Sequence, residues 1–453
     1  MPLPALALSG AVVLAFSGYA FARWATLQSS ALDLAYFDQV VWNAAQGHGF
    51  VSSFAPYPFF GQHFSPALGL LVPFYWIHPS PLWLLAAQSL ALGAAVVPLY
   101  VLARTWLDHR SSMVVCVAYA AQLFVLRAVN YDFHTEALAV PFVFLAVLGA
   151  ARASRTGDSV LLLSGVAPLL GKEDGALVSL GIGFLAWAVL RRRAGLVLMA
   201  LSVVDGVVVT VLVMPAIRDG QPGDLIDRYS YLGSSVAGVL LGLATHPHIA
   251  LLHVLRPGPL IAVAIMLAGV AFLPLARPLA AIAALPSLML ELLSSHVPQS
   301  TLLDQYGLQP GPLLFVAALL GWVRIASRWK VSPARLKFGW LTPGRGPGAA
   351  LLAGALVALV VAAPQPTLGS WSKGQAAQKL ATEVPPDASV DASDHLATML
   401  AERESIGVLP SSGRDWIAVD VSAEGADQVA GLPGRGYVFV GRWGVLSLWR
   451  RQA

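Results

Sequence analysis

The feature that most constrains this chain is a series of long apolar blocks. They run for about 17 to 22 residues, and an α-helix of that length crosses the hydrocarbon core of a bilayer. Only helices and closed barrels satisfy the backbone in lipid, and these blocks are too long and continuous for barrel strands. Of 453 residues, 57% are hydrophobic and 11% are charged, whereas roughly a quarter of a soluble chain is charged. The sequence therefore predicts an all-α polytopic membrane protein and excludes a soluble globular domain.

We expect about 11 membrane-spanning helices, with boundaries uncertain by a few residues. They are placed at residues 3–23, 82–104, 112–129, 137–152, 159–171, 175–190, 194–216, 259–276, 279–295, 310–327 and 347–364. The segment at 159–171 is short, so we expect it to be tilted or broken. The N-terminal block lacks early Lys and Arg and is followed by further spans, so we interpret it as a retained helix and not as a signal peptide.

Basic residues are shared unequally between alternate loops. If the N-terminus is cytoplasmic, the cytoplasmic loops hold fourteen Lys and Arg residues, and the outer loops before the tail hold six. Because positive charge collects in cytoplasmic loops, this count favours a cytoplasmic N-terminus. Arg23 is a local exception, since it follows the first span on the outer side.

Two long loops, at 24–81 and 217–258, fall on the outer side. In the first, residues 33–46 are expected to form a short helix with Asp33 as its N-cap and Gly47 as its stop. The apolar, aromatic segment at 66–77 is too short to span and is expected to lie in the membrane interface. In the second loop, an apolar stretch interrupted by Thr-His-Pro-His predicts helices that lie flat. The alternative is that it forms a span and inverts everything after it, and the arginine count argues against that inversion.

The tail after residue 365 has the composition of a soluble sequence. The predicted elements are strands at 388–392 and 416–421, a helix at 395–403, and a hairpin of 437–440 and 445–449. The chain is therefore divided into a transmembrane domain at 1–365 and a small α/β domain at 366–453. Counting spans places this C-terminal domain outside the cytoplasm.

Acidic residues and histidines gather in the outer loops. They are Asp33, Asp38, His63, Asp132, His134, Glu136 and the run Lys172-Glu173-Asp174. The loops on the other side hold mostly arginine. This separation predicts a polar site on the outer face.

The order of features in the first outer loop resembles the GT-C glycosyltransferases, which are polytopic enzymes that take a sugar from a polyprenyl-phosphate carrier. More closely, the chain resembles a bacterial family of predicted membrane proteins of unknown function that is grouped with that fold. The matching pieces are Asp33 with Phe37-Asp38-Gln39 and Trp42; His63-Phe64-Ser65-Pro66; Asp132-Phe133-His134 with Glu136; Lys172-Glu173-Asp174; and Asp387-Ala388-Ser389-Val390 through Asp394-His395-Leu396. The resemblance covers most of the chain, and it implies a GT-C-like fold in the bacterial inner (plasma) membrane.

This resemblance implies a transferase that moves a sugar from a polyprenyl-phosphate donor to a glycan, lipid or protein acceptor of the cell envelope. In GT-C enzymes the base is an aspartate of the first outer loop, which implies Asp33. Many members have Asp-Glu there, whereas Leu34 follows Asp33 here. Asp38 is the second catalytic candidate, but it lies about 140° around a helix from Asp33, so the two share no face. His63 stands where some relatives have Lys, and its role is open.

Glycosyl transfer also needs positive charge or polar groups at the departing phosphate. The substrate-binding candidates are His63, Arg127, His134, Glu136, Lys172, Glu173, Asp174 and Arg228. Structural roles compete with each assignment: helix capping, a charged turn between spans, or a snorkelling arginine. The gathered acids would suit Mg²⁺ or Mn²⁺, but no ligand spacing requires a metal, so metal dependence is left open.

Other functions remain as alternatives. Asp205 lies in the middle of a predicted span, and an ionisable residue at membrane depth is a functional candidate by default, which favours a transporter or flippase. A non-enzymatic envelope scaffold that binds through its tail is the third interpretation. The sequence has no phosphate-cradling glycine loop, nucleophile elbow or zinc spacing, and we expect membrane lipids but no nucleic acid among its partners.

Overall fold

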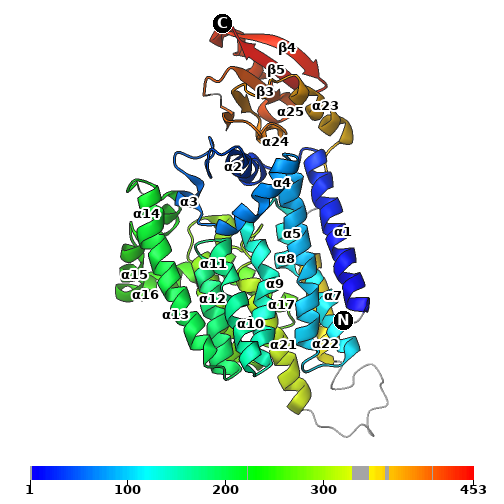
Figure 1. The fold of residues 1–453 in the computed structure, drawn as a ribbon, viewed down its shortest axis with the longest axis vertical. Coiled ribbons are helices and arrows are strands. Elements are labelled where there is room, and N and C mark those ends of the chain that lie inside the picture. Colours follow the sequence, from blue (N-terminus) through cyan, green and yellow to red (C-terminus); the bar gives the residue numbers. More distant parts are fainter. Residues whose placement is uncertain (1–2, 222, 329–345, 363–366, 411, 453) are drawn as a thin grey trace.

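A computed structural model describes residues 3–221, 223–328, 346–362, 367–410 and 412–452. A helical bundle carries a small sheet at one end, and the N-terminus lies toward the opposite end (Figure 1). The predicted domain boundary at 365/366 lies outside the described residues. So do four of the fourteen basic residues counted above: Lys330, Arg335, Lys337 and Arg345.

Five helices are long and apolar enough to cross a membrane, or six if one bent pair forms a single span. They are α1 (Leu3–Ala25), α5–α6 (Leu82–Ala103), α7–α8 (His109–Asn130), α13–α14 (Ala194–Ile217) and α21 (Pro310–Arg328). The predicted count of about 11 is therefore not confirmed in the described part of the chain.

The remaining predicted spans are helical but short. They contain α9 (Val140–Ala151), α10 (Arg155–Gly165), α11 (Ala167–Gly171), α12 (Gly175–Phe184), α17 (Pro257–Gly269), α18 (Pro278–Ala281), α19 (Leu285–Leu292) and α22 (Gly346–Ala362). Proline stands in the first turn of α9, α11, α17, α18 and α19. Because proline lacks an N–H and clashes with the preceding turn, a continuous apolar block is cut into separate helices. The break predicted near 159–171 is found between α10 and α11.

The first long loop folds into short helices on the sheet-bearing end of the bundle (Figure 1). They are η1 (Ala31–Ala35, a π-turn), α2 (Tyr36–Ala45), α3 (Phe59–Gln62), η2 (Pro66–Leu71) and α4 (Val72–Ile77). Gly47 has φ +85°, as its predicted role as the helix stop requires. The predicted N-cap was wrong: Ser30 occupies that position and Asp33 lies inside the π-turn. The Asp33 carboxylate is therefore free to face neighbouring elements.

The second long loop contains η6 (Asp224–Tyr229), α15 (Val236–Thr245) and α16 (Pro247–Val254). The axes of α15 and α16 differ by 94°. The break falls at His246 and Pro247, where the sequence predicted an interruption. By length and composition this bent pair is a candidate for a broken span or a re-entrant loop, and the prediction that the two helices lie flat stays untested.

The tail forms a five-stranded mixed sheet in the order β2-β1-β3-β5-β4. Its strands are β1 (Val390–Ala392), β2 (Ile406–Val408), β3 (Trp416–Asp420), β4 (Tyr437–Trp443) and β5 (Leu446–Arg451). The predicted strands and hairpin are present, but β2 and the helix α23 (Trp371–Thr382) were missed. The predicted helix at 395–403 is wrong beyond α24 (Asp394–Ala397), because the chain turns there toward β2. Arg403 holds this turn by donating to the carbonyl oxygens of Leu400, Pro385 and Ala388.

The sheet domain and the first loop share one hydrophobic core. Leu27, Ala31 and Ala35 of the loop pack in the same buried cluster as Leu380 and Leu396 of the tail. Hydrogen bonds join the same two segments. Asp394 Oδ1 accepts from the Ala31 N–H at 2.8 Å, His395 Nδ1 lies 2.8 Å from the Ser29 carbonyl oxygen, and Gln39 donates to the Arg403 carbonyl at 2.7 Å. The tail is therefore built onto the loop that carries Asp33.

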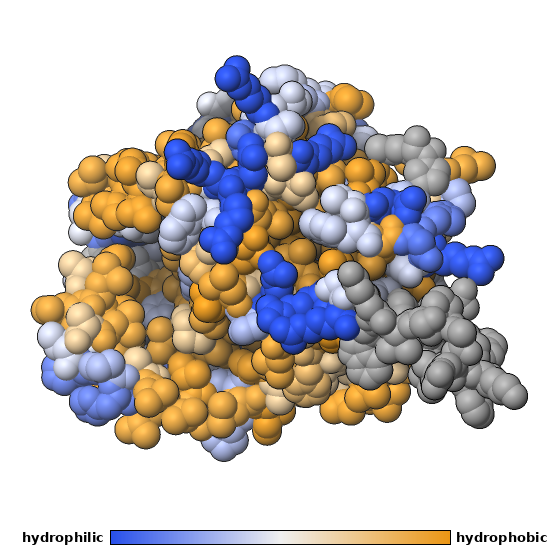
Figure 2. Space-filling view, turned by 90° about the horizontal axis from the view of Figure 1, so that it is seen from below, coloured by the Kyte–Doolittle hydropathy of each residue, from blue (hydrophilic) through white to orange (hydrophobic). Residues whose placement is uncertain are grey.

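The opposite end of the bundle presents hydrophilic groups amid apolar surface (Figure 2). Arginines cluster where helices end or begin on this side: Arg104 after α6, Arg152 after α9, Arg191–Arg193 before α13, and Arg328 at the end of α21. The charge separation expected from the sequence is thus present in the fold. The orientation of the bundle in a membrane stays a prediction.

Candidate functional site

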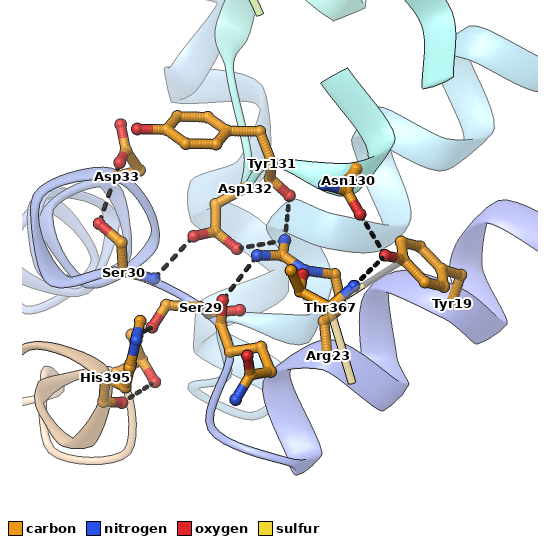
Figure 3. Close-up of polar contacts among 12 residues, drawn as sticks. Tyr19, Arg23, Ser29, Ser30, Asp33, Asn130, Tyr131, Asp132, Thr367 and His395 are labelled. Carbon is orange, nitrogen blue, oxygen red and sulfur yellow. Dashed lines mark hydrogen bonds and ion pairs between the residues drawn. The ribbon is translucent and has the colours of Figure 1, made fainter. Parts of the chain in front are cut away.

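A buried ion pair fixes the entrance to the first loop (Figure 3). Arg23, in the last turn of α1, places Nη1 3.2 Å from Asp132 Oδ1, and both side chains are at most 7% exposed. Arg23 Nε also donates to Thr367 Oγ1 at 2.9 Å. The second Asp132 oxygen accepts from the Ser30 N–H at 2.7 Å, and Ser30 Oγ donates to Asp33 Oδ2 at 2.9 Å. Arg23 therefore acts inside the protein, which explains why it breaks the loop-charge rule.

The Asp33 carboxylate faces His134. Their atoms Oδ1 and Nε2 are 3.4 Å apart, and the Tyr131 ring stacks on the imidazole with centroids 5.5 Å apart. Burial by itself would raise the pKa of Asp33, but hydrogen bonding and charge from His134, with bonds from Tyr131 and Ser30, hold it below its usual value. Burial would lower the pKa of His134, but its bond and charge interaction with Asp33 raise it. The site therefore favours a carboxylate paired with an imidazolium.

The run Lys172-Glu173-Asp174 lies beside this pair, and its side chains are 13–15% exposed. Lys172 Nζ is 2.8 Å from Glu136 Oε1 and 3.5 Å from Asp174 Oδ2. Burial opposes the charge on Lys172, but the surrounding acids raise its pKa well above the usual value. Burial raises the pKa of Asp174 to about 6. The negative charges of Glu173 and Glu136 also raise this pKa, whereas the positive charge of Lys172 lowers it. Lys172 is therefore the counter-ion of an acidic turn.

His63 joins the first loop to this acidic turn. Its Nδ1 lies 3.4 Å from Glu173 Oε1, and the other Glu173 oxygen accepts from the Phe64 N–H at 3.0 Å. Burial favours protonation of Glu173, but the bond and charge interaction with His63 lower its pKa. Residues that are 110 positions apart in the sequence thus meet as the prediction of one outer site requires.

Arg228 approaches the site from the second long loop. Its Nη1 donates to Gln299 Oε1 at 2.9 Å and to the Tyr306 hydroxyl at 3.3 Å. In the described part of the chain Arg228 forms no ion pair. Tyr306 interacts electrostatically with both Arg228 and Lys172, so this tyrosine links the guanidinium to the acidic turn. Arg228 therefore offers a positive charge whose partners are neutral.

Glu291 of α19 also belongs to this cluster, although the sequence did not identify it as a site residue. It is 2% exposed and interacts with Gln299, Asp174 and Lys172. An isolated acid within an apolar block was the available signal, and it is the same signal that singled out Asp205.

Two predicted site residues have other hydrogen-bond partners. Asp38 is buried beneath α4, where its Oδ1 accepts from the Tyr75 hydroxyl at 2.6 Å. Burial, with the nearby Glu402, raises the pKa of Asp38 well above its usual value, so the neutral acid is favoured. Arg127 donates to the carbonyl oxygens of Leu302 and Ala362. The catalytic role of Asp38 and the substrate-binding role of Arg127 stay predictions.

Metal binding by the gathered acids finds no geometric support. Among the described residues, no group of three or more His, Cys, Asp and Glu side chains is placed to hold a metal ion. The acids instead meet cationic and amide side chains. Dependence on Mg²⁺ or Mn²⁺ therefore stays an open expectation.

The helical bundle, its short loop helices and the sheet domain above them define a GT-C-like membrane protein. ArnT from Cupriavidus metallidurans in the apo state superposes with a TM-score of 0.52 at 14% identity, over 98% of this chain and 98% of that chain. ArnT bound to undecaprenyl phosphate gives 0.52 at 12% identity, over 99% and 98%. At these identities the likeness shows the fold alone.

Residues 23–430 match the family described as "Predicted membrane protein (DUF2079)", and the chain belongs to that family. The resemblance inferred from the outer-loop motifs is thereby confirmed. Among curated proteins none matches the sequence.

Proposed function

We propose that this protein is an integral membrane glycosyltransferase that moves a sugar from a polyprenyl-phosphate carrier to an acceptor of the cell envelope. The observation that carries the proposal is the Asp33 side chain paired with His134 at the end of the bundle that also holds Arg228. The GT-C-like fold supports it, because ArnT with the same fold was solved with undecaprenyl phosphate bound.

In this reaction an acceptor hydroxyl attacks the anomeric carbon of the sugar. The bond from that carbon to the phosphate oxygen breaks, and the electron pair leaves with polyprenyl phosphate. Asp33 takes the hydroxyl proton as general base. Arg228 stabilises the charge on the departing phosphate, since its own partners are neutral. Lys172 is neutralised by Glu136 and Asp174, so we assign it to shaping the site and not to the phosphate.

The excess of basic residues at the other end of the bundle supports an outward-facing site. We therefore place the protein in the inner (plasma) membrane as a multi-pass protein, with its N-terminus in the cytoplasm and the sheet domain outside it. The acceptor is then a glycan, lipid or protein that reaches the outer surface.

A transfer assay tests the proposal. The purified protein in lipid vesicles is given polyprenyl-phosphate pentoses and hexoses with labelled sugar, together with an envelope extract as acceptor. We expect the label to leave the lipid carrier and enter the extract while polyprenyl phosphate accumulates. Retention of all label on the carrier, for every sugar tried, would exclude transfer of those sugars and contradict the proposal for them.

Transport is the second candidate, and one observation favours it. Asp205 of α13 has a buried Oδ2 without a hydrogen-bond partner among the described residues. The same vesicle assay separates the two functions, because a flippase moves labelled lipid across the bilayer with the sugar still attached. The larger set of polar groups lies at the end of the bundle, which supports transfer.

The pair of Asp33 and His134 predicts how activity responds to pH. Asp33 is ionised above its lowered pKa and His134 is charged below its raised pKa, so the pair is intact between these values. His134→Gln removes the positive charge beside Asp33, so the effect of burial dominates and the pKa of Asp33 rises. We expect the acid limb of the kcat/KM profile to move to higher pH. His63→Gln is the control, because His63 pairs with Glu173, and an unmoved acid limb in His134→Gln would disprove the coupling.

A further inference from the structure

Two buried acceptor atoms beside the acidic turn have no donor. Glu291 Oε2 and Gln309 Oε1 make no hydrogen bond within the described chain, although the residues are only 2% and 5% exposed. Buried polar atoms in proteins are nearly always paired, so each exception calls for a partner. Two such atoms in one place indicate a site for a molecule that donates hydrogen bonds.

The two side chains belong to the same cluster. Gln309 donates through Nε2 to Asp174, and Asp174 interacts electrostatically with Glu291. Gln309 also lines a cavity with Glu136 and Lys172. The other wall of this cavity is apolar and includes Val140, Val143 and Val178. This cavity has room for about one water molecule.

Two donor side chains of the cluster have other partners. Lys172 is paired with Glu136 and Asp174, and the Gln299 amide donates to the Tyr229 hydroxyl. A phosphate carries acceptors and negative charge, so this acid-rich wall disfavours it. Sugar hydroxyls supply both the donors and the neutrality that these atoms require.

The amide of Gln299 connects this wall to Arg228. Its oxygen accepts from Arg228 at 2.9 Å, and the side chain also interacts with Glu291. One sugar phosphate could therefore reach Arg228 with its phosphate and Glu291 with its hydroxyls.

We propose that Glu291 and Gln309 bind hydroxyl groups of the carrier-linked sugar and thereby select which sugar is accepted. This inference rests on the proposed function, because it places the donor's phosphate at Arg228. The residues bind the donor and take no proton in the reaction, whereas Asp33 remains the base. Substitution of either side chain should therefore weaken binding of the sugar-bearing carrier and leave binding of the bare carrier unchanged.

The test compares two ligands on the full-length protein in lipid nanodiscs. One is a short-chain polyprenyl phosphate, and the other is the same lipid bearing a pentose or a hexose. We expect the wild type to bind one sugar-bearing lipid more tightly than the bare lipid. Glu291→Gln and Gln309→Leu should each weaken that binding by about tenfold and leave the affinity for the bare lipid within about twofold. Trp322→Phe is the control, since it also removes a buried polar atom without a hydrogen-bond partner among the described residues and lies outside the site.

The outcomes separate this inference from the function on which it rests. If both variants bind the sugar-bearing lipid as tightly as the wild type, the sugar-binding wall is wrong and the transferase proposal stands. If the wild type binds neither lipid, both proposals fail. Thermal unfolding of each variant shows whether it is folded. If Glu291→Gln does not fold, the binding result for Gln309→Leu decides the test. Equal loss for both lipids would assign these residues to the phosphate end and overturn the inference.

Discussion

Asp33→Asn is expected to lower sugar transfer by about 10²- to 10⁴-fold, the usual contribution of a general base. The amide has nearly the shape of the carboxylate, but it cannot accept the acceptor's proton. Ser30 can still donate to the remaining side-chain oxygen, so the π-turn should keep its geometry. The measurement is kcat for label transfer in vesicles, with donor binding measured on the same sample to show that the site is intact.

Asp38→Asn is the matched comparison. Asp38 is buried with its neutral form favoured, and an asparagine oxygen can still accept from the Tyr75 hydroxyl. We therefore expect transfer within a fewfold of the wild type. If Asp33→Asn retains full activity while Asp38→Asn loses it, the base has been assigned to the wrong aspartate. Full activity in both variants would exclude both carboxylates as the base.

The membrane class and the positions of the helical segments could be predicted from apolar block length. The lengths of the helices could not, because residues such as Pro141 and Pro286 interrupt blocks that hydropathy treats as continuous. The N-cap was assigned to Asp33 in the first loop for a related reason. A π-turn shifts the capping position to Ser30, and no local composition signals a π-turn.

The members of the candidate site were predictable where they lay in loops on one predicted side. Asp33, His134 and Lys172 carried that signal, and their meeting follows from helices that end at a common level. Glu291 and Gln309 carried a weaker signal, since one lies in an apolar helix and the other lies just before an apolar span. Their importance depends on missing hydrogen bonds, which a sequence does not display.

The docking of the tail on the first loop was also beyond the sequence. Composition marked residues 366–453 as a soluble domain but did not indicate which part of the chain it contacts. The contact between Ala31 and Asp394 joins residues 363 positions apart, and no periodicity reports such a pairing. Because α24 and the first loop share this core, substitutions in α24 should shift the loop backbone and with it the position of Asp33.

Arg23→Met is expected to destabilise the protein by about 3–5 kcal/mol, because it leaves the Asp132 carboxylate buried without its counter-ion. The same change also removes the bond to Thr367, which holds the start of the tail against α1. The measurement is the free energy of unfolding in mixed micelles, or the midpoint of thermal unfolding in detergent.

The double variant Arg23→Met with Asp132→Asn tests whether the loss comes from an unpaired charge. Asparagine is neutral and can still accept from the Ser30 N–H, so the double variant should recover part of the lost stability. Arg192→Met is the control, since its ion pair with Asp158 lies at the arginine-rich end with both side chains partly exposed, and its removal should change little. Equal effects of Arg23→Met and Arg192→Met would contradict a buried role for Arg23. The position of Arg23 on the outer side, against the positive-inside rule, would then be explained by its contact with solvent and not by its ion pair with Asp132.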